Sequence, residues 1–301
     1  MAAEKNWFTA RAEYFAALVL MTALRRVPLP VAWLVANAAM RVLDFAVPKL
    51  RRVARINLSF AFPALTAKQR EVIIKNVFAG IARLLVTFAR FPDLHRNNIN
   101  QWIEYEGLEH YLEAKRAGRG VLVATAHLGN WELSAFAHAL LTESMNVMVR
   151  PLDNEQIDEL VETRRTLSGN RLIYKQDGAR AVLRALKANE AVGILVDQNT
   201  ATTEGVFVDF FGKPACASPV FVKFAHRSGA PIIPGFALWD EGRRRYRLRF
   251  YPPIELTGDV AEDTQRMHSA IENVIRAHPD QWLWIHRRWK TRPPGELSPY
   301  N

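Results

Sequence analysis

His127 and Glu132 are the residues whose types and spacing point most directly to chemistry. They lie five positions apart in Ala126-His127-Leu128-Gly129-Asn130-Trp131-Glu132. The apolar, β-branched run before them (121–125) predicts a buried strand, and the run from 132 to 141 has the apolar spacing of a helix. The imidazole is therefore expected where a strand ends and a helix begins, with Glu132 reaching back to accept a hydrogen bond from the ring. Such a pair fixes the tautomer and strengthens the histidine as a base toward a hydroxyl.

The simpler interpretation is two surface residues that are near one another by chance. The strand-to-helix setting favours a site instead, because α/β sheets bind ligands at the carboxyl ends of their strands. No metal is predicted, since the two-histidine helical spacing of zinc proteases is absent. The single cysteine, Cys216, lies between alanines, so it is expected to be a small core residue rather than a nucleophile.

Length and charge limit the possible classes of protein. The chain has 301 residues, 49% of them hydrophobic, which is enough for one large α/β domain or two smaller ones. The net charge of +10 lies entirely in the first third: residues 1–100 carry fifteen Lys or Arg and five Asp or Glu, whereas residues 101–301 carry twenty-five of each. A basic segment that is also apolar suggests an anionic membrane surface before nucleic acid, for which no motif is present.

The same third contains two apolar runs, 14–24 and 31–47. Basic residues end the first, and Asn37, Arg41 and Asp44 interrupt the second, so neither is expected to reach the roughly 20 apolar residues of a membrane span. We expect no secretory signal. Ordinary packed helices are one interpretation, and helices that lie on or dip into the membrane are the other. Two groups of side chains suit the second: interfacial aromatics at Trp7, Phe8, Tyr14, Phe15 and Trp33, and a basic cluster at Lys49, Arg51, Arg52 and Arg55.

Residues 68–91 give the clearest helical pattern, with apolar side chains from Ile73 to Phe88 at a 3.6-residue period. This face predicts core packing, or alternatively a groove for an acyl chain.

From about residue 101, short apolar strands alternate with helices. The fold class predicted is α/β, a largely parallel sheet flanked by helices with an N-terminal amphipathic and apolar helical region. Strands are expected at 121–125, 146–150, 171–174, 191–196, 231–238 and 245–254, and helices at 108–117, 153–167, 178–187, 219–228 and 259–277.

Two regions follow from the change of pattern: a membrane-association region at 1–100 and a catalytic domain at 101–301, which we expect to form one continuous fold.

Four later segments are candidates to join His127. Each also has a plain explanation as a helix end, a turn, a loop or a packed terminal helix. They contain Arg164 and Arg165, Asp197 and Gln198, Phe211 and Gly212, and the aromatic and basic run 282–290.

The motifs together resemble the bacterial lipid A biosynthesis acyltransferases, the late lauroyl and myristoyl transferases of the lysophospholipid acyltransferase superfamily. The resemblance runs over nearly the whole chain and in the right order. It is carried by His-Leu-Gly-Asn-Trp-Glu (127–132), Asp197-Gln198, Phe-Phe-Gly-Lys-Pro-Ala (210–215), Pro-Ile-Ile-Pro (231–234) and Trp-Ile-His-Arg-Arg-Trp-Lys (284–290). The glycerol-phosphate branch differs, because it has Asp at the position of Glu132 and a Pro-Glu-Gly-Thr-Arg block near 196–199.

The resemblance implies an α/β enzyme at the cytoplasmic face of the bacterial inner membrane, peripheral or shallowly inserted, without a metal or prosthetic group. Its co-substrate is an acyl thioester, on acyl carrier protein or coenzyme A, and its acceptor is a lipid A precursor or a related lipid. By resemblance, His127 is the catalytic base and Glu132 its partner. Arg165, with Arg164 as the alternative, is the basic site residue, and Asp197 is a site aspartate. Gln198, Asn130, Trp131, Phe211 and Gly212 complete the expected substrate-binding set.

The same reaction can be argued from the residues themselves, without the resemblance. A lipid hydroxyl must lose its proton as it attacks a thioester, and His127 would accept that proton. A thioester is already activated, so no enzyme nucleophile is required. Backbone N–H groups near Gly129 and Asn130 are expected to bind the oxyanion, and Arg165 an acceptor phosphate. Two other functions remain: a thioesterase that uses water as acceptor, and a non-catalytic peripheral membrane protein.

Overall fold

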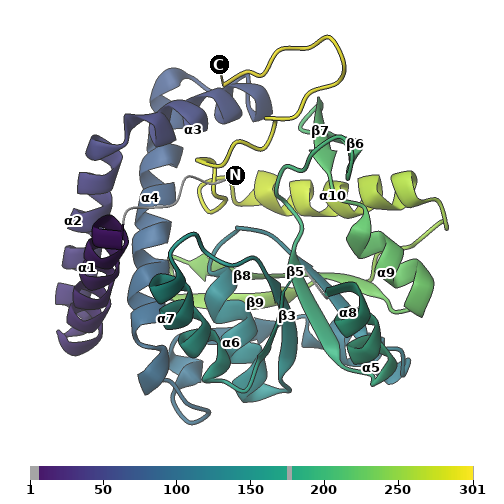
Figure 1. The fold of residues 1–301 in the computed structure, drawn as a ribbon, viewed down its shortest axis with the longest axis horizontal. Helices are drawn as coiled ribbons and strands as arrows, with labels where there is room; N and C mark the ends of the chain where they lie inside the picture. The colour runs from purple at the N-terminus through teal and green to yellow at the C-terminus, as the bar shows by residue number, and fades with distance from the viewer. Residues whose placement is uncertain (1–6, 175–177, 301) are drawn as a thin grey trace.

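A seven-stranded sheet forms the centre of the computed structural model, which describes residues 7–174 and 178–300 (Figure 1). Its strand order is β1-β9-β8-β2-β5-β3-β4, and every neighbouring pair is parallel except β8 and β9. The strands are β1 (Ile103–Glu106), β2 (Val121–Thr125), β3 (Met145–Val149), β4 (Arg171–Tyr174), β5 (Ala191–Leu195), β8 (Ile232–Asp240) and β9 (Arg245–Phe250). This confirms the α/β class and the largely parallel sheet.

Helices cover the sheet and extend beyond one side of it (Figure 1). The helices that come after β1 in the sequence are α5 (Leu108–Arg116), α6 (Trp131–Leu141), α7 (Glu155–Thr166), α8 (Gly178–Lys187), α9 (Val220–Ser228) and α10 (Val260–Ala277). The N-terminal helices are α1 (Trp7–Arg26), α2 (Leu29–Ala46), α3 (Pro48–Ala61) and α4 (Ala67–Ala89), and two short 3-10 helices, η1 (Phe91–Asp93) and η2 (Ile99–Gln101), lead into β1.

Helix α4 joins the N-terminal helices to the sheet. A capping box starts it, in which the Thr66 side chain accepts from the Gln69 N–H while the Gln69 side chain accepts from the Thr66 N–H. Its apolar side chains, such as Ile74 and Val77, are buried, as the sequence predicts for core packing. Helices α1 and α2 pack on it from outside, and α6 packs on it from the sheet side (Figure 1).

The two regions expected at 1–100 and 101–301 share one hydrophobic core, which runs from Met21 to Tyr300. Polar contacts also join them. Asn57 on α3 donates to the carbonyl oxygens of Trp284 and His286 (2.6 and 2.7 Å) and accepts from the Tyr300 hydroxyl (2.6 Å). The N-terminal helices are therefore built into the body of the protein.

Four segments differ from the sequence-based interpretation. Strand β1 is an extra edge strand, and residues around 210–215, expected as a loop, form a hairpin of β6 (Val206–Phe210) and β7 (Lys213–Ala217). The expected strand at 245–254 ends at Phe250, before Pro252 and Pro253, which have no N–H to donate to a neighbouring strand. A packed terminal helix, one of the interpretations of 282–290, is not formed, because this segment is irregular and buries three tryptophans, Trp282, Trp284 and Trp289.

Helices α1 and α2 present apolar side chains to the outside. Phe8, Leu34, Val42 and Phe45 are 72%, 70%, 67% and 90% exposed. Among the described residues, two helices are long and apolar enough to cross a membrane: α2, of which 17% is buried, and α4, of which 56% is buried. Asn37, Arg41 and Asp44 do not interrupt α2, which is a continuous helix of 18 residues, and the expectation that this run does not span a membrane stays a prediction.

The basic cluster on α3 is only partly available to a membrane. Arg51 forms ion pairs with Asp44 and Glu71, and Arg55 pairs with Glu71. The hydrogen bond from Arg55, and then that from Arg51, lowers the pKa of Glu71 despite burial. Arg51 and Arg55 are thus paired within the protein, and contact of the cluster with anionic headgroups stays a prediction.

Candidate active site

His127 and Asp197 lie at the carboxyl ends of adjacent parallel strands. His127 follows β2 and Asp197 follows β5, and these strands pair in a register that ends with Thr125 beside Leu195. One more backbone bond, from the Val196 N–H to the Thr125 carbonyl (3.0 Å), continues the pairing past the strands. The sheet therefore brings together two residues that are 70 positions apart in the sequence.

Asp197 binds His127 twice. Its Oδ1 accepts from the His127 Nδ1–H and its Oδ2 from the His127 backbone N–H, both at 2.9 Å. The indole N–H of Trp282 also donates to Oδ2 at 2.8 Å. A carboxylate only accepts hydrogen bonds, so the neutral ring carries its proton on Nδ1 and has a lone pair on Nε2.

Burial and charge act in opposite directions on this pair. Burial lowers the pKa of His127, but the charge and hydrogen bond of Asp197, with a further contribution from Glu132, outweigh it and leave the pKa raised above 6.5. Burial would raise the pKa of Asp197, yet His127 and the Trp282 hydrogen bond hold it well below its usual value. The His127 side chain keeps 14% of its surface exposed while Asp197 keeps 3%, so the ring is the member of the pair that solvent can reach.

Glu132 has a different partner from the one the sequence predicts. Its carboxylate accepts two hydrogen bonds from Arg165, from Nε at 2.9 Å and Nη2 at 2.6 Å. The predicted hydrogen bond between Glu132 and the His127 ring is therefore wrong, because the guanidinium takes both carboxylate oxygens while Asp197 takes the ring. Arg165, expected to grip an acceptor phosphate, binds Glu132 through Nε and Nη2, and its phosphate-binding role stays a prediction. Glu132 still lies close enough for its charge to raise the pKa of His127.

The backbone N–H groups expected to bind an oxyanion are already occupied. The Gly129 N–H donates to the Gln281 carbonyl (3.0 Å) and the Asn130 N–H donates to the Ala237 carbonyl (2.9 Å). Gly129 is required here, because it has φ +66° and a Cβ would lie 2.0 Å from the Ala237 oxygen. The buried Asn130 side chain caps α6 by accepting from the Leu133 N–H (3.0 Å). This loop is thus held rigidly against the sheet.

Two other predicted residues do lie beside His127. The exposed side chain of Gln198 places its Nε2 3.4 Å from His127 Nε2, and the Trp131 ring meets the imidazole edge to face at 5.0 Å between centroids. Arg164 does not join them in any described hydrogen bond; it is buried and donates to the Leu160 carbonyl (3.2 Å). Burial, with the charge of Arg25, lowers the pKa of Arg164.

Phe211 and Gly212 are placed behind the site rather than in it. They form the turn of the β6–β7 hairpin, where Gly212 is exposed and Phe211 is 4% exposed. The Phe211 ring stacks on Trp282 at 6.5 Å between centroids, and Trp282 in turn holds Asp197. These residues, expected to line a substrate pocket, here form packed aromatic support for the Asp197 carboxylate.

Comparison with known proteins identifies the family of the chain. The family model described as bacterial lipid A biosynthesis acyltransferase matches residues 3–291. The chain belongs to this family. It is 32% identical over 269 residues to the lipid A biosynthesis palmitoleoyltransferase of Escherichia coli (strain K12), covering 86% of each chain. It is also 30% identical to the lauroyltransferase of that organism, covering 83% of each chain, and 27% identical to its myristoyltransferase, covering 83% of this chain and 78% of the relative.

The chain is accordingly an acyltransferase of lipid A biosynthesis. Within the described part of this acyltransferase, no group of three or more His, Cys, Asp or Glu side chains has an arrangement that would hold a metal ion. The expectation of no cofactor stays a prediction.

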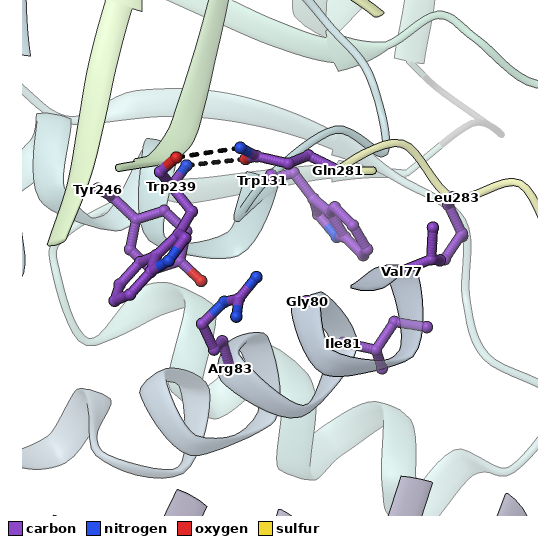
Figure 2. A pocket seen from close by; sticks show the side chains of 10 residues that line it. Val77, Gly80, Ile81, Arg83, Trp131, Trp239, Tyr246, Gln281 and Leu283 are labelled. Atoms are coloured by element: carbon purple, nitrogen blue, oxygen red, sulfur yellow. Dashed lines mark hydrogen bonds between the residues drawn. The ribbon is translucent and has the colours of Figure 1, made fainter. Parts of the chain in front are cut away.

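A pocket beside the acyltransferase site contains residues that the sequence analysis did not single out (Figure 2). It lies between α4 and the loop after β2, and Trp131 links it to the imidazole. Its other walls include Arg83, Trp239 and Tyr246. Gln281 supports the Trp239 backbone, accepting from its N–H (2.8 Å) and donating to its carbonyl (3.0 Å). No sequence signal connects these residues, because they come from four separate segments.

Proposed function

We propose that the protein transfers a fatty acyl group from an acyl thioester to a hydroxyl of a lipid A precursor or related glycolipid, with His127 as the general base. The observation that carries this proposal is the anchoring of His127 Nδ1 by Asp197, which leaves Nε2 as the proton-accepting edge. Glu132, the expected partner, acts on the ring through its charge rather than through a hydrogen bond.

The reaction proceeds by direct transfer. The acceptor oxygen attacks the thioester carbonyl carbon while its proton moves to His127 Nε2. Asp197 stabilises the imidazolium that forms, and the charge of Glu132 adds to this effect. The tetrahedral intermediate then collapses, the carbon–sulfur bond breaks, and the departing thiolate takes the proton from the imidazolium. No covalent acyl-enzyme forms.

The oxyanion needs a donor other than the Gly129 and Asn130 N–H groups. Gln198 is the candidate, because its amide lies beside the reacting edge of His127 on an exposed side chain. In the resting site this amide faces the lone pair of Nε2. An acceptor hydroxyl would displace it, and the freed N–H groups would turn to the carbonyl oxygen of the thioester.

Arg165 takes a positioning role in this scheme. Its planar guanidinium holds Glu132 by two parallel hydrogen bonds, an arrangement that fixes orientation as well as distance. Burial would lower the pKa of Arg165, but the hydrogen bonds to Glu132 raise it above its ordinary value. The ion pair thereby keeps a negative charge near the imidazole.

The donor is an acyl thioester on acyl carrier protein or coenzyme A, both of which are anionic and suit a chain of net charge +10. We place the enzyme at the cytoplasmic face of the inner membrane. The exposed apolar side chains of α1 and α2 support this placement, since a contiguous apolar face on a protein surface marks an interaction with lipid or protein. An α-helix of 18 residues is about 27 Å long, which approaches the thickness of the hydrocarbon core.

The test is to incubate the purified full chain with radiolabelled acyl carrier protein thioester or acyl-CoA and a lipid A precursor in detergent micelles. Acylated lipid and free fatty acid are measured separately. We expect acylated lipid from one donor, and its loss in His127→Ala. The matched control is His95→Ala, which removes an exposed imidazole from another part of the chain. Undiminished transfer by His127→Ala refutes the proposal, and fatty acid without acylated lipid indicates a thioesterase.

A further inference from the structure

Helices α8 and α9 carry a basic surface that the proposed reaction does not use. The two helices pack against one another, and neither contains an acidic residue. Their exposed cations follow the outer face of each helix and are Arg180, Arg184 and Lys187 on α8 and Lys223 and Arg227 on α9. Within residues 7–174 and 178–300 none of these five forms an ion pair, whereas the arginines of β9 are paired with the acids of β1. We call these two rows the α8–α9 surface.

Arg119 joins the two rows where the helices end. A Cβ built on Gly229, the C-cap of α9, would lie 3.3 Å from Arg119 Cδ, and a Cβ built on Gly120 would lie 2.8 Å from the Leu186 Cα of α8. Arg119 is itself exposed. At the other end of α9, Val220 is 42% exposed on the same helix face as the two α9 cations. Cations that surround an apolar side chain, with no acid between them, favour an anionic protein partner.

Both helices start at the edge of the sheet where His127 lies. Helix α8 comes between β4 and β5 in the sequence, and α9 leads into β8. These three strands run parallel to β2, which ends just before His127. Each helix therefore begins at the carboxyl ends of the strands and runs back along the sheet. The ten residues of α8 extend only about 15 Å from this edge, so a thioester on a flexible arm can reach His127 from the α8–α9 surface.

We infer that the α8–α9 surface docks the acidic carrier protein that presents the acyl thioester. This inference rests on the proposed function, because it takes the donor to be a thioester. The surface lies on the side of the molecule away from α1 and α2, so a bilayer that meets those helices leaves α8 and α9 to a partner from the aqueous phase (Figure 1). The phosphates of coenzyme A are gathered at one end of that molecule and would meet only part of the two rows. An acidic helix of a carrier protein can follow their full length, and opposite charges would both guide its approach and fix its orientation.

The experiment compares wild type with the double variant Arg184→Glu/Lys223→Glu. The matched control is Lys68→Glu/Lys75→Glu, which reverses two exposed cations of α4 and changes the net charge equally. With an acyl carrier protein thioester and the acceptor in neutral micelles, we expect the first double variant to raise the donor KM by about tenfold or more, while kcat and the acceptor KM stay within about twofold. Added salt should raise the donor KM of wild type and narrow the difference between the two enzymes. With acyl-pantetheine, which keeps the thioester and lacks the carrier protein, the enzymes should not differ.

A binding measurement separates this inference from the proposed function. Titration of fluorescently labelled acyl carrier protein with His127→Ala protein measures docking without transfer. Loss of binding on adding Arg184→Glu/Lys223→Glu, with binding kept on adding Lys68→Glu/Lys75→Glu, supports the surface even where no transfer occurs. A folded Arg184→Glu/Lys223→Glu protein that keeps its donor KM or its affinity for the carrier overturns the inference, and so do equal losses in the two double variants. Duplex DNA that binds as tightly as the carrier also overturns it, because the surface would then attract any polyanion.

Discussion

The contact between Asp197 and His127 gives the sharpest prediction, which concerns Asp197→Asn. Asp197 Oδ2 accepts from two N–H groups, those of the His127 backbone and the Trp282 indole, and Oδ1 accepts from the imidazole. Asparagine has one oxygen and one NH₂ group, so its oxygen will face the two fixed N–H donors. Its NH₂ group then faces His127 Nδ1, and the ring must accept there and carry its proton on Nε2. The reacting edge loses its lone pair.

The expected result is a fall in kcat of about 10²–10⁴, equivalent to roughly 3–5 kcal/mol of transition-state stabilisation. The acceptor KM should change little. The acid limb of the pH–rate profile should also shift. In wild type, the transfer rate rises as the pH passes the raised pKa of His127, because the base must be neutral to accept a proton. Loss of the Asp197 carboxylate lowers that pKa, so the acid limb of the profile moves to lower pH.

The assay is the initial rate of acylated lipid formation between pH 5 and 9. Asp263→Asn is the matched control, because Asp263 is also buried and also pairs with a histidine, His226 (2.7 Å), on α9. It should lose stability without a comparable loss of kcat. The reasoning is refuted by an Asp197→Asn enzyme that keeps its kcat within about threefold and its acid limb in place.

Four further predictions follow from particular contacts. Glu132→Gln should lower kcat less than Asp197→Asn does and cost about 1–3 kcal/mol of stability, because it leaves Arg165 unpaired in a partly buried place; a double-mutant cycle with Arg165→Gln that gives no coupling would contradict this. Gly80→Ala should stabilise the protein by about 0.5–1 kcal/mol in urea unfolding, because its Cβ meets no neighbour, and a loss of stability would show that the space is not open. Asn57→Ala should cost about 1–3 kcal/mol of stability, since it breaks three hydrogen bonds of a buried side chain. Unchanged stability would argue against a polar connection between α3 and the C-terminal segment. Phe45→Asp should weaken flotation with anionic vesicles at unchanged thermal stability, and equal flotation would remove α2 from the membrane interface.

Much of the fold is readable in the sequence because local patterns determine it. The apolar run at 121–125 and the run from Ala191 match their strands closely, and the helical pattern begins and ends near the limits of α4. Strand β1 is harder to predict because it has only four residues and lies at the sheet edge, although Ile-Glu-Tyr-Glu alternates between apolar and polar side chains. The irregular path of 282–290 is set by the burial of its three tryptophans in the core, which no local pattern in the sequence predicts.

The site is only half predictable for a different reason. His127 and Asp197 both stand out as polar residues at the ends of apolar strands. Their pairing depends on β2 and β5 being neighbours, although β3 and β4 lie between them in the sequence. The choice between Glu132 and Asp197 as partner of the imidazole depends on where α7 brings Arg165, and that is a property of the assembled fold.

Chemical rescue of His127→Gly tests the central claim most directly. The variant leaves a cavity where the ring was, and the account predicts negligible transfer that imidazole in the buffer partly restores, in proportion to the concentration of neutral imidazole. Restoration should be much weaker when Asp197→Asn is added, because the carboxylate no longer orients the added base. Full transfer by His127→Gly without imidazole would contradict the assignment of this histidine as the base.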